Sequence, residues 1–187
     1  DSLVRTALNA IQKQFFSPVV WEDFFIIHPK KAQKKLQIGL ILAGNLPAIG
    51  LHDLLMVLAS GQVAQMKLSS QDKSLMQLYV GAMKEFDPLI PIHFIDRLQG
   101  MDAVIATGSD FSGGYFSHYF STTPHIIRKN RSSLAVLRGN ESINDFQGLA
   151  EDIFTYYGLG CRNVSTLAIP KDYDLIPLFD VLSKEDW

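Results

Sequence analysis

The sequence is poor in cysteine, with Cys161 as the single thiol among 187 residues. One thiol excludes an internal disulfide framework and any metal site built from several thiolates. The five histidines show no spacing typical of metal ligands, so no metal site is predicted. A lone thiol stays free in a reducing compartment, and we therefore expect a cytoplasmic protein.

Charge of one sign and long apolar runs are also missing. The formal charge is −2, and no long basic block is present to bind phosphate backbones, which argues against a nucleic-acid partner. No apolar run approaches the roughly 18 residues of a membrane span. The first residues lack a basic-then-apolar signal pattern. We therefore expect no nucleic-acid partner and no membrane span.

Short apolar runs alternate with stretches of helical periodicity along the chain. Strands are predicted at residues 36–42, 63–68, 92–95, 103–107, 125–128, 134–137 and 164–169. Helices are predicted at residues 3–16, 50–59, 72–86, 111–120, 143–157 and 174–182. This alternation predicts an α/β fold: a Rossmann-like parallel sheet with helices on both faces.

Ligands of such sheets bind beyond the carboxyl ends of the strands, where this sequence places three polar loops. They span residues 43–47, 67–70 and 106–109. No GxGxxG turn and no P-loop is present. The segment Thr107-Gly108-Ser109 closes an apolar strand and opens a helix, which is compatible with an ordinary turn or with a phosphate site at the helix N-terminus.

Two interpretations of Cys161 stay open. Free cysteines are often small buried hydrophobes. Gly158 and Gly160, however, make a permissive turn around Cys161, and Arg162 would favour the reactive thiolate. Backbone N–H groups of such a turn would also help to stabilise an oxyanion.

Four segments in this order and spacing resemble the aldehyde dehydrogenase superfamily. They are most similar to the acyl-CoA reductases related to the fatty acid reductase of bacterial bioluminescence. The segments are AGNLPAIGLHDLLMVLASGQVAQMKLSS (residues 43–70), DAVIATGSD (102–110), HIIRKNRSSLAVLRGNES (125–142) and YYGLGCRNVSTLAIP (156–170).

The resemblance implies a role for each matching residue. Cys161 matches the family's nucleophile, and Asn45 matches the asparagine whose amide helps to hold the oxyanion. Lys67 and Ser69 lie where the family contacts the adenosine ribose. The turn of Thr107, Gly108 and Ser109 matches the one that the pyrophosphate and nicotinamide pass.

Two departures from the family pattern bear on which reaction and which cofactor are expected. Hydrolytic members carry a glutamate base where this chain has Ile127, and no carboxylate lies between Asp110 and Glu141. NAD-selective members place a glutamate after the Lys67 region, where Ser70 and Gln71 stand here. We therefore expect reduction of a fatty acyl-CoA to an aldehyde with NADPH, while NAD remains allowed.

The resemblance also implies a division of the chain. Residues 1–157 are expected to form a dinucleotide-binding domain with an N-terminal helix. Residues 158–187 are expected to hold the catalytic cysteine loop and the start of an incomplete catalytic domain. The family builds its oligomerisation segment after this cysteine, so a homo-oligomer is expected of a full-length protein.

Two other functions remain open. One is a non-catalytic nucleotide-binding or interaction module, or a fragment, in which Cys161 is buried and inert. The other is an ordinary aldehyde-oxidising enzyme of the same fold, which Ile127 disfavours.

Overall fold

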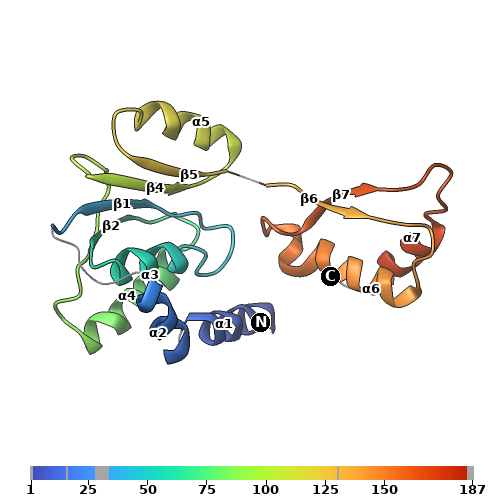
Figure 1. Cartoon of the computed structure of the whole chain (residues 1–187), viewed down its shortest axis with the longest axis horizontal. Helices are drawn as coiled ribbons and strands as arrows, with labels where there is room; N and C mark the ends of the chain where they lie inside the picture. Colours follow the sequence, from blue (N-terminus) through green and yellow to red (C-terminus); the bar gives the residue numbers. More distant parts are fainter. Residues whose placement is uncertain (1, 16, 28–33, 130, 185–187) are drawn as a thin grey trace. The chain divides into compact units, whose positions relative to one another are not determined.

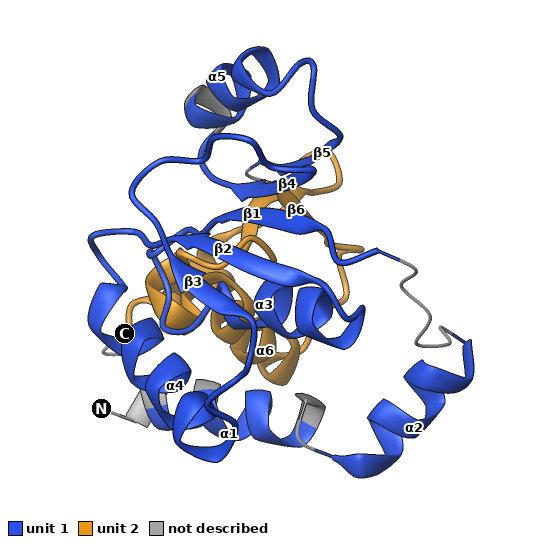
Figure 2. Ribbon diagram, turned by 90° about the vertical axis from the view of Figure 1, so that its left-hand side faces the viewer, with its two compact units in different colours: residues 1–129 blue, residues 130–187 orange. Residues whose placement is uncertain are grey.

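The computed structural model describes residues 2–15, 17–27, 34–129 and 131–184 (Figure 1). The chain forms two compact units, Asp1–Lys129 and Asn130–Trp187 (Figure 2). Within the described residues, no helix combines the length and the apolar character needed to traverse a bilayer.

The first unit is built on a five-stranded sheet in the order β3-β2-β1-β4-β5, in which every pairing is parallel. Its strands are β1 (Gln37–Ile41), β2 (Val63–Lys67), β3 (Ile92–Phe94), β4 (Ala103–Thr107) and β5 (His125–Arg128). Leu40 of β1, the central strand, is fully buried, as expected for a parallel sheet covered on both faces. The predicted parallel α/β sheet is confirmed.

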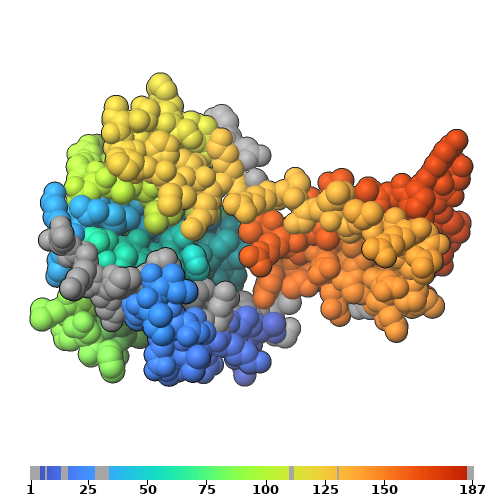
Figure 3. Space-filling model, viewed as in Figure 1, coloured from blue at the N-terminus to red at the C-terminus, as the bar shows by residue number. Residues whose placement is uncertain are grey.

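Helices cover both faces of this sheet (Figure 1). The helices of this unit are α1 (Ser2–Phe15), α2 (Pro18–Ile27), α3 (Leu51–Ala59), α4 (Lys73–Phe86) and α5 (Asp110–Tyr119). On one face, Leu54 of α3 and Val80 of α4 pack against Leu40. On the other face, Phe116 and Phe120 pack against Val104, and α5 forms the outer layer (Figure 3).

Helix α2 is the one helix of this unit that the sequence pattern does not predict. Its residues Val19, Val20, Trp21, Phe24 and Phe25 are β-branched or aromatic types with modest helix propensity and no helical alternation. Pro18 occupies the first helical position, where its missing N–H costs no hydrogen bond.

The second unit packs helices against a separate two-stranded parallel sheet of β6 (Ser133–Val136) and β7 (Val164–Ala168). Its helices are α6 (Ile143–Phe154), the short 3-10 helix η1 (Thr155–Gly158) and α7 (Ile176–Leu182). Phe146, Leu149 and Leu178 form its core.

The boundary between the compact units therefore differs from the one expected between residues 157 and 158. It lies after Lys129, because β6 and α6 pack with β7 and α7 instead of joining the five-stranded sheet. Which functions the two predicted segments carry stays a prediction.

Helix α6 is shorter than the predicted range 143–157. A capping box between Ser142 and Asp145 begins it, as the pattern of such residues allows. The helix ends at Phe154, since Tyr156 and Tyr157 both adopt positive φ, at 57° and 58°. Left-handed backbone cannot continue a right-handed helix, so the chain leaves α6 just before the Cys161 loop.

A carboxylate ties together two loops of the second unit. Glu141, after β6, accepts hydrogen bonds from the Tyr173 hydroxyl at 2.6 Å and from the N–H groups of Arg138 and Gly139. The Tyr173 hydroxyl, followed by the Arg138 N–H, lowers the pKa of Glu141 to about 2. The same bond raises the pKa of Tyr173 to about 12.

We expect Tyr173→Phe to raise the pKa of Glu141, because the strongest donor to its carboxylate is lost. A lowered pKa means that the stabilisation is complete above the ordinary value of 4.5 and disappears as the pH falls through about 2. The stability difference between wild type and Tyr173→Phe should shrink over that interval. Carboxyl NMR titration and urea unfolding measure both effects, with the exposed Tyr157→Phe as control. An unchanged Glu141 pKa in Tyr173→Phe would contradict this assignment.

Candidate functional site

The strand order creates a point of divergence at the carboxyl edge of the five-stranded sheet. From β1 the chain passes through α3 to β2 on one side, and from β4 it passes through α5 to β5 on the other. Helices α3 and α5 lie on opposite faces, so the loops after β1 and β4 separate there (Figure 1). Open α/β sheets bind their ligands at such a switch point.

The loop after β1 carries Asn45, whose side chain lies in an exposed position. Gly44 brings this loop against the loop after β2: a Cβ on Gly44 would lie 2.4 Å from the Ser69 Oγ and 2.7 Å from its Cβ. Ala48 has a positive φ of 56°, an uncommon conformation for a residue with a side chain. Contacts from the surrounding residues must therefore hold the backbone of Ala48 in this conformation.

Asp72 supplies part of that enforcement. It is the N-cap residue of α4, but its side chain makes no capping bond. The carboxylate instead accepts a 2.9 Å hydrogen bond from the Ala48 N–H. Burial raises the pKa of Asp72, and the bond from Ala48 acts in the opposite direction. This buried carboxylate thus ties the Asn45 loop to the start of α4.

The predicted ribose contacts follow β2. Lys67 ends that strand, opposite Ile41 of β1, and its side chain is exposed. Ser69 is half-buried, and its hydroxyl accepts a 3.3 Å hydrogen bond from the Gln71 N–H. A cationic amine and a hydroxyl are therefore available beside the Asn45 loop.

The predicted turn follows β4. Thr107 ends β4 opposite Arg128 of β5, and the Gly108 N–H donates a 3.1 Å hydrogen bond to the Arg128 carbonyl. Ser109 is the N-cap of α5 and accepts a hydrogen bond from the Ser112 N–H. A Cβ on Gly108 would lie 3.1 Å from Ser112, so this turn fits a glycine best.

The structure adds an ion pair that the sequence motifs do not single out. Arg128, at the end of β5, donates a hydrogen bond to Asp53 in the first turn of α3. Asp53 is only 4% exposed and also bonds His52 at 3.2 Å. One available signal was a carboxylate within an otherwise apolar helix, since buried charges require a partner.

Cys161 lies in the second unit, in the loop between η1 and β7, and it is exposed. The interpretation of Cys161 as a buried residue is therefore wrong, because the loop carries it at the surface. Asn163 shapes this loop: its carbonyl oxygen accepts from the Gly160 N–H at 2.8 Å, and its amide donates to the carbonyls of Asp152 and Thr155. This role of Asn163 was not predicted from the sequence.

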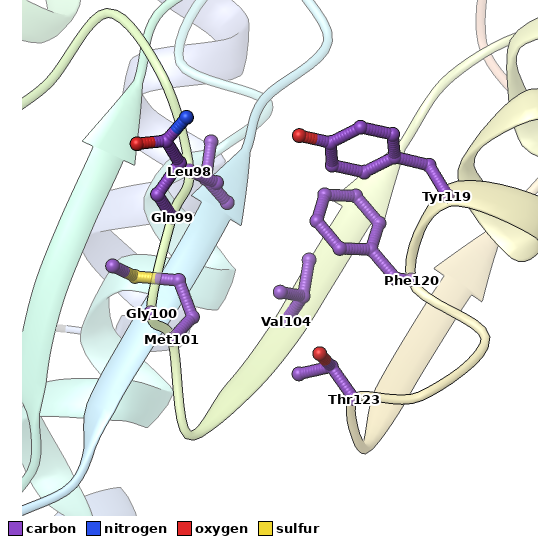
Figure 4. A pocket seen from close by; sticks show the side chains of 8 residues that line it. All are labelled: Leu98, Gln99, Gly100, Met101, Val104, Tyr119, Phe120 and Thr123. Atoms are coloured by element: carbon purple, nitrogen blue, oxygen red, sulfur yellow. The ribbon is translucent and has the colours of Figure 1, made fainter.

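The predicted residues of the first unit, from Asn45 to Ser109, all lie at the carboxyl end of β1, β2 or β4 or in the loop after it, along one edge of one sheet. Two hollows lie elsewhere. One, of about 250 Å³, sits at the opposite, amino edge between residues 98–104 and the end of α5 (Figure 4). The other, of about 570 Å³, lies in the second unit between β6 and α6. Neither is lined by a predicted site residue.

Comparison with known proteins addresses the fold. No protein-family model and no curated protein matches the sequence. Solved structures do match. The aldehyde dehydrogenase of Bacillus cereus, solved as its NAD+ complex, gives a TM-score of 0.68 at 17% identity, over 80% of this chain and 34% of its own. The fold of this chain is an aldehyde dehydrogenase fold.

Two further structures agree. The aldehyde dehydrogenase of Bartonella henselae gives a TM-score of 0.69 at 17% identity, over 79% of this chain and 35% of its own. Aldehyde dehydrogenase C of Pseudomonas syringae, in complex with NAD+ and octanal, gives a TM-score of 0.68 at 14% identity, over 80% of this chain and 34% of its own. The chain thus spans about a third of the length of these proteins. The expected superfamily fold is confirmed.

We expect Gly44→Ala to destabilise the first unit by about 1–3 kcal/mol, a typical cost of inserting an atom into a packed site. The new methyl group would overlap Ser69. Replacing Ser69 by glycine removes the overlapping atoms, so Gly44→Ala combined with Ser69→Gly should recover much of the loss. Denaturant unfolding measures this cycle, with Gly114→Ala as control because nothing lies near its Cβ position. Additive effects would show that the two loops do not touch.

Proposed function

We propose that this chain contains the cofactor-binding region and the cysteine loop of an NADPH-dependent acyl-CoA reductase. The observation that carries the proposal is the gathering of Asn45, Lys67, Ser69 and the Thr107–Ser109 turn at the switch point of a parallel sheet. An exposed thiol at Cys161 supports the catalytic part. NAD remains an alternative cofactor.

The chemical groups at this edge suit a dinucleotide. Helix α5 follows its N-cap residue Ser109, and the positive end of its dipole there would favour a phosphate. Gly108 carries no side chain that would keep a ligand from the backbone. Lys67 would contribute a positive charge and Ser69 a hydroxyl toward the adenosine ribose. When bound, NADPH supplies the hydride.

Cys161 would act as the nucleophile. Its thiolate attacks the thioester carbonyl, forming a carbon–sulfur bond and a tetrahedral oxyanion. Asn45 and the Cys161 N–H would donate hydrogen bonds to that oxygen. Collapse expels coenzyme A as a thiolate and leaves an acyl group on Cys161. A bound NADPH, held by Lys67, Ser69 and the Thr107–Ser109 turn, would supply hydride to the acyl carbon. Together with a proton on the oxygen, this would release the aldehyde and regenerate the Cys161 thiol.

Residues at the end of β5 favour reduction over oxidation to an acid. Ile127, at the position of the family's glutamate base, packs against the core on the α5 side. Its neighbour Arg128 is a cation, and the nearby carboxylate Asp53 is buried and paired with it. A general base must be free to take a proton from water, and neither Ile127 nor the paired Asp53 offers that here. The acyl group would therefore remain on Cys161 until it is reduced, instead of being hydrolysed.

Intact-mass measurement after incubation with myristoyl-CoA tests the nucleophile. Wild type should gain the mass of one acyl group, and Cys161→Ala should gain none. Asn45→Ala should form the adduct about 10²–10³-fold more slowly, the usual cost of losing one oxyanion donor. Asn140→Ala, an exposed asparagine in the second unit, is the matched control.

An adduct of equal yield in Cys161→Ala would exclude Cys161 as the nucleophile. Conversion of an aldehyde to an acid with NAD would favour the aldehyde-oxidising alternative. Nucleotide binding without any adduct would favour the non-catalytic module.

The choice of cofactor is tested by placing a carboxylate after β2. No acidic side chain stands at Ser70 or Gln71 to repel the 2′-phosphate of NADPH. We expect Ser70→Glu to weaken NADPH binding by about tenfold or more, because like charges are juxtaposed. NADH binding should change little. Fluorescence titration measures both, with Ser121→Glu as control; equal losses for the two nucleotides would show that Ser70 does not lie beside the 2′ position.

A further inference from the structure

We propose that Arg128 and Asp53 are positioning residues that hold the Asn45 loop and the Thr107–Ser109 turn in the relative placement needed to bind a nicotinamide dinucleotide. The proposal rests on the proposed function for the identity of the ligand. The placement itself rests on contacts within the first unit.

Arg128 holds the turn through its backbone. Its carbonyl accepts the 3.1 Å hydrogen bond from the Gly108 N–H, and its Cα is paired with that of Thr107 across β4 and β5. Any displacement of the end of β5 therefore moves the acceptor on which Gly108 depends. If the Arg128 side chain is removed, its carbonyl can still accept from Gly108, but the end of β5 is no longer held to α3 through Asp53.

Asp53 holds the other side of the switch point. It lies in the first turn of α3, which starts directly after the loop that carries Asn45. The N-terminal turn of a helix favours a negative charge, so the carboxylate suits this position. Its bond to Arg128 joins α3, which follows β1, to β5, and the two strands are separated in the sheet by β4.

The burial of Asp53 makes the pair more than a surface contact. Only two charged residues are buried among those described, Asp53 at 4% and Asp72 at 8%, and both border the Asn45 loop. Asp72 holds the loop at Ala48, and Asp53 holds the helix that follows it. A buried carboxylate without a cation is costly, so the loop and β5 cannot separate freely. The planar guanidinium of arginine fixes direction as well as charge, which a lysine does not.

The test measures NADPH and NADH affinity together with hydrogen exchange at the Gly108 amide, in the full 187-residue chain. Arg128→Met and Asp53→Asn should each weaken nucleotide binding about tenfold or more, because small displacements of binding groups are expensive. Each should also speed exchange at Gly108. Arg128→Lys should restore part of both, and the double variant should be no worse than the worse single variant.

Arg97→Met, an exposed arginine of the same unit, is the control and should leave both readouts unchanged. Affinities are compared at a temperature where circular dichroism shows every variant folded. If Arg128→Met does not fold, Arg128→Lys replaces it in the comparison. Unchanged affinity and unchanged Gly108 exchange in folded Arg128→Lys and Asp53→Asn would overturn the proposal. So would a double variant whose loss of binding free energy equals the sum of the two single losses. If wild type binds neither nucleotide, the proposed function fails, and Gly108 exchange alone then decides whether the pair positions the turn.

Discussion

A buried carboxylate needs a partner, and the proposed site depends on that constraint. Asp53 and Asp72 are both removed from water, one in the helix that follows the Asn45 loop and the other bonded to Ala48 of that loop. Each reaches a group from a distant part of the sequence: Arg128 is 75 positions from Asp53, and Ala48 is 24 positions from Asp72. Breaking the first bond would leave the buried Asp53 without its arginine cation, and breaking the second would leave Asp72 without the Ala48 donor. The loop is therefore fixed by electrostatics as well as by packing.

The sheet order explains why these bonds lie at a functional position. A parallel sheet directs all its carboxyl ends to one edge, and the change of direction between β1 and β4 keeps the following helices out of the space between their loops. Gly44 and Gly108 then keep side chains out of the closest approaches. The five-stranded sheet thus provides a polar carboxyl edge, while the amino edge carries a hollow of mixed lining near Phe120.

Much of this arrangement could be predicted from the sequence. Apolar runs such as residues 36–42 and 103–107 predict the buried strands, because short apolar runs bounded by turn residues are typical of strands in a parallel sheet. The loops that carry Asn45, Lys67 and Ser109 follow from where those strands end. The Arg128–Asp53 pair could not be predicted in this way, because its two residues meet only through the tertiary order of the strands.

Three other features could not be predicted from the sequence, each for a physical reason. The role of Asp72 depends on which N–H group its carboxylate meets, and it accepts from Ala48 instead of from the first turn of α4. Helix α2 has no apolar alternation from which to predict it. The division after Lys129 depends on which core β6 joins, and a strand pattern does not specify its neighbours.

The central claim is that the carboxyl edge of the five-stranded sheet binds a nicotinamide dinucleotide. Backbone amide NMR during titration with NADPH tests it most directly. The account predicts that the largest shift changes fall on Gly44, Asn45, Gly108 and Ser109. Shift changes confined to the hollow lined by Leu98 and Tyr119, or no shift changes at any nucleotide concentration, would contradict it.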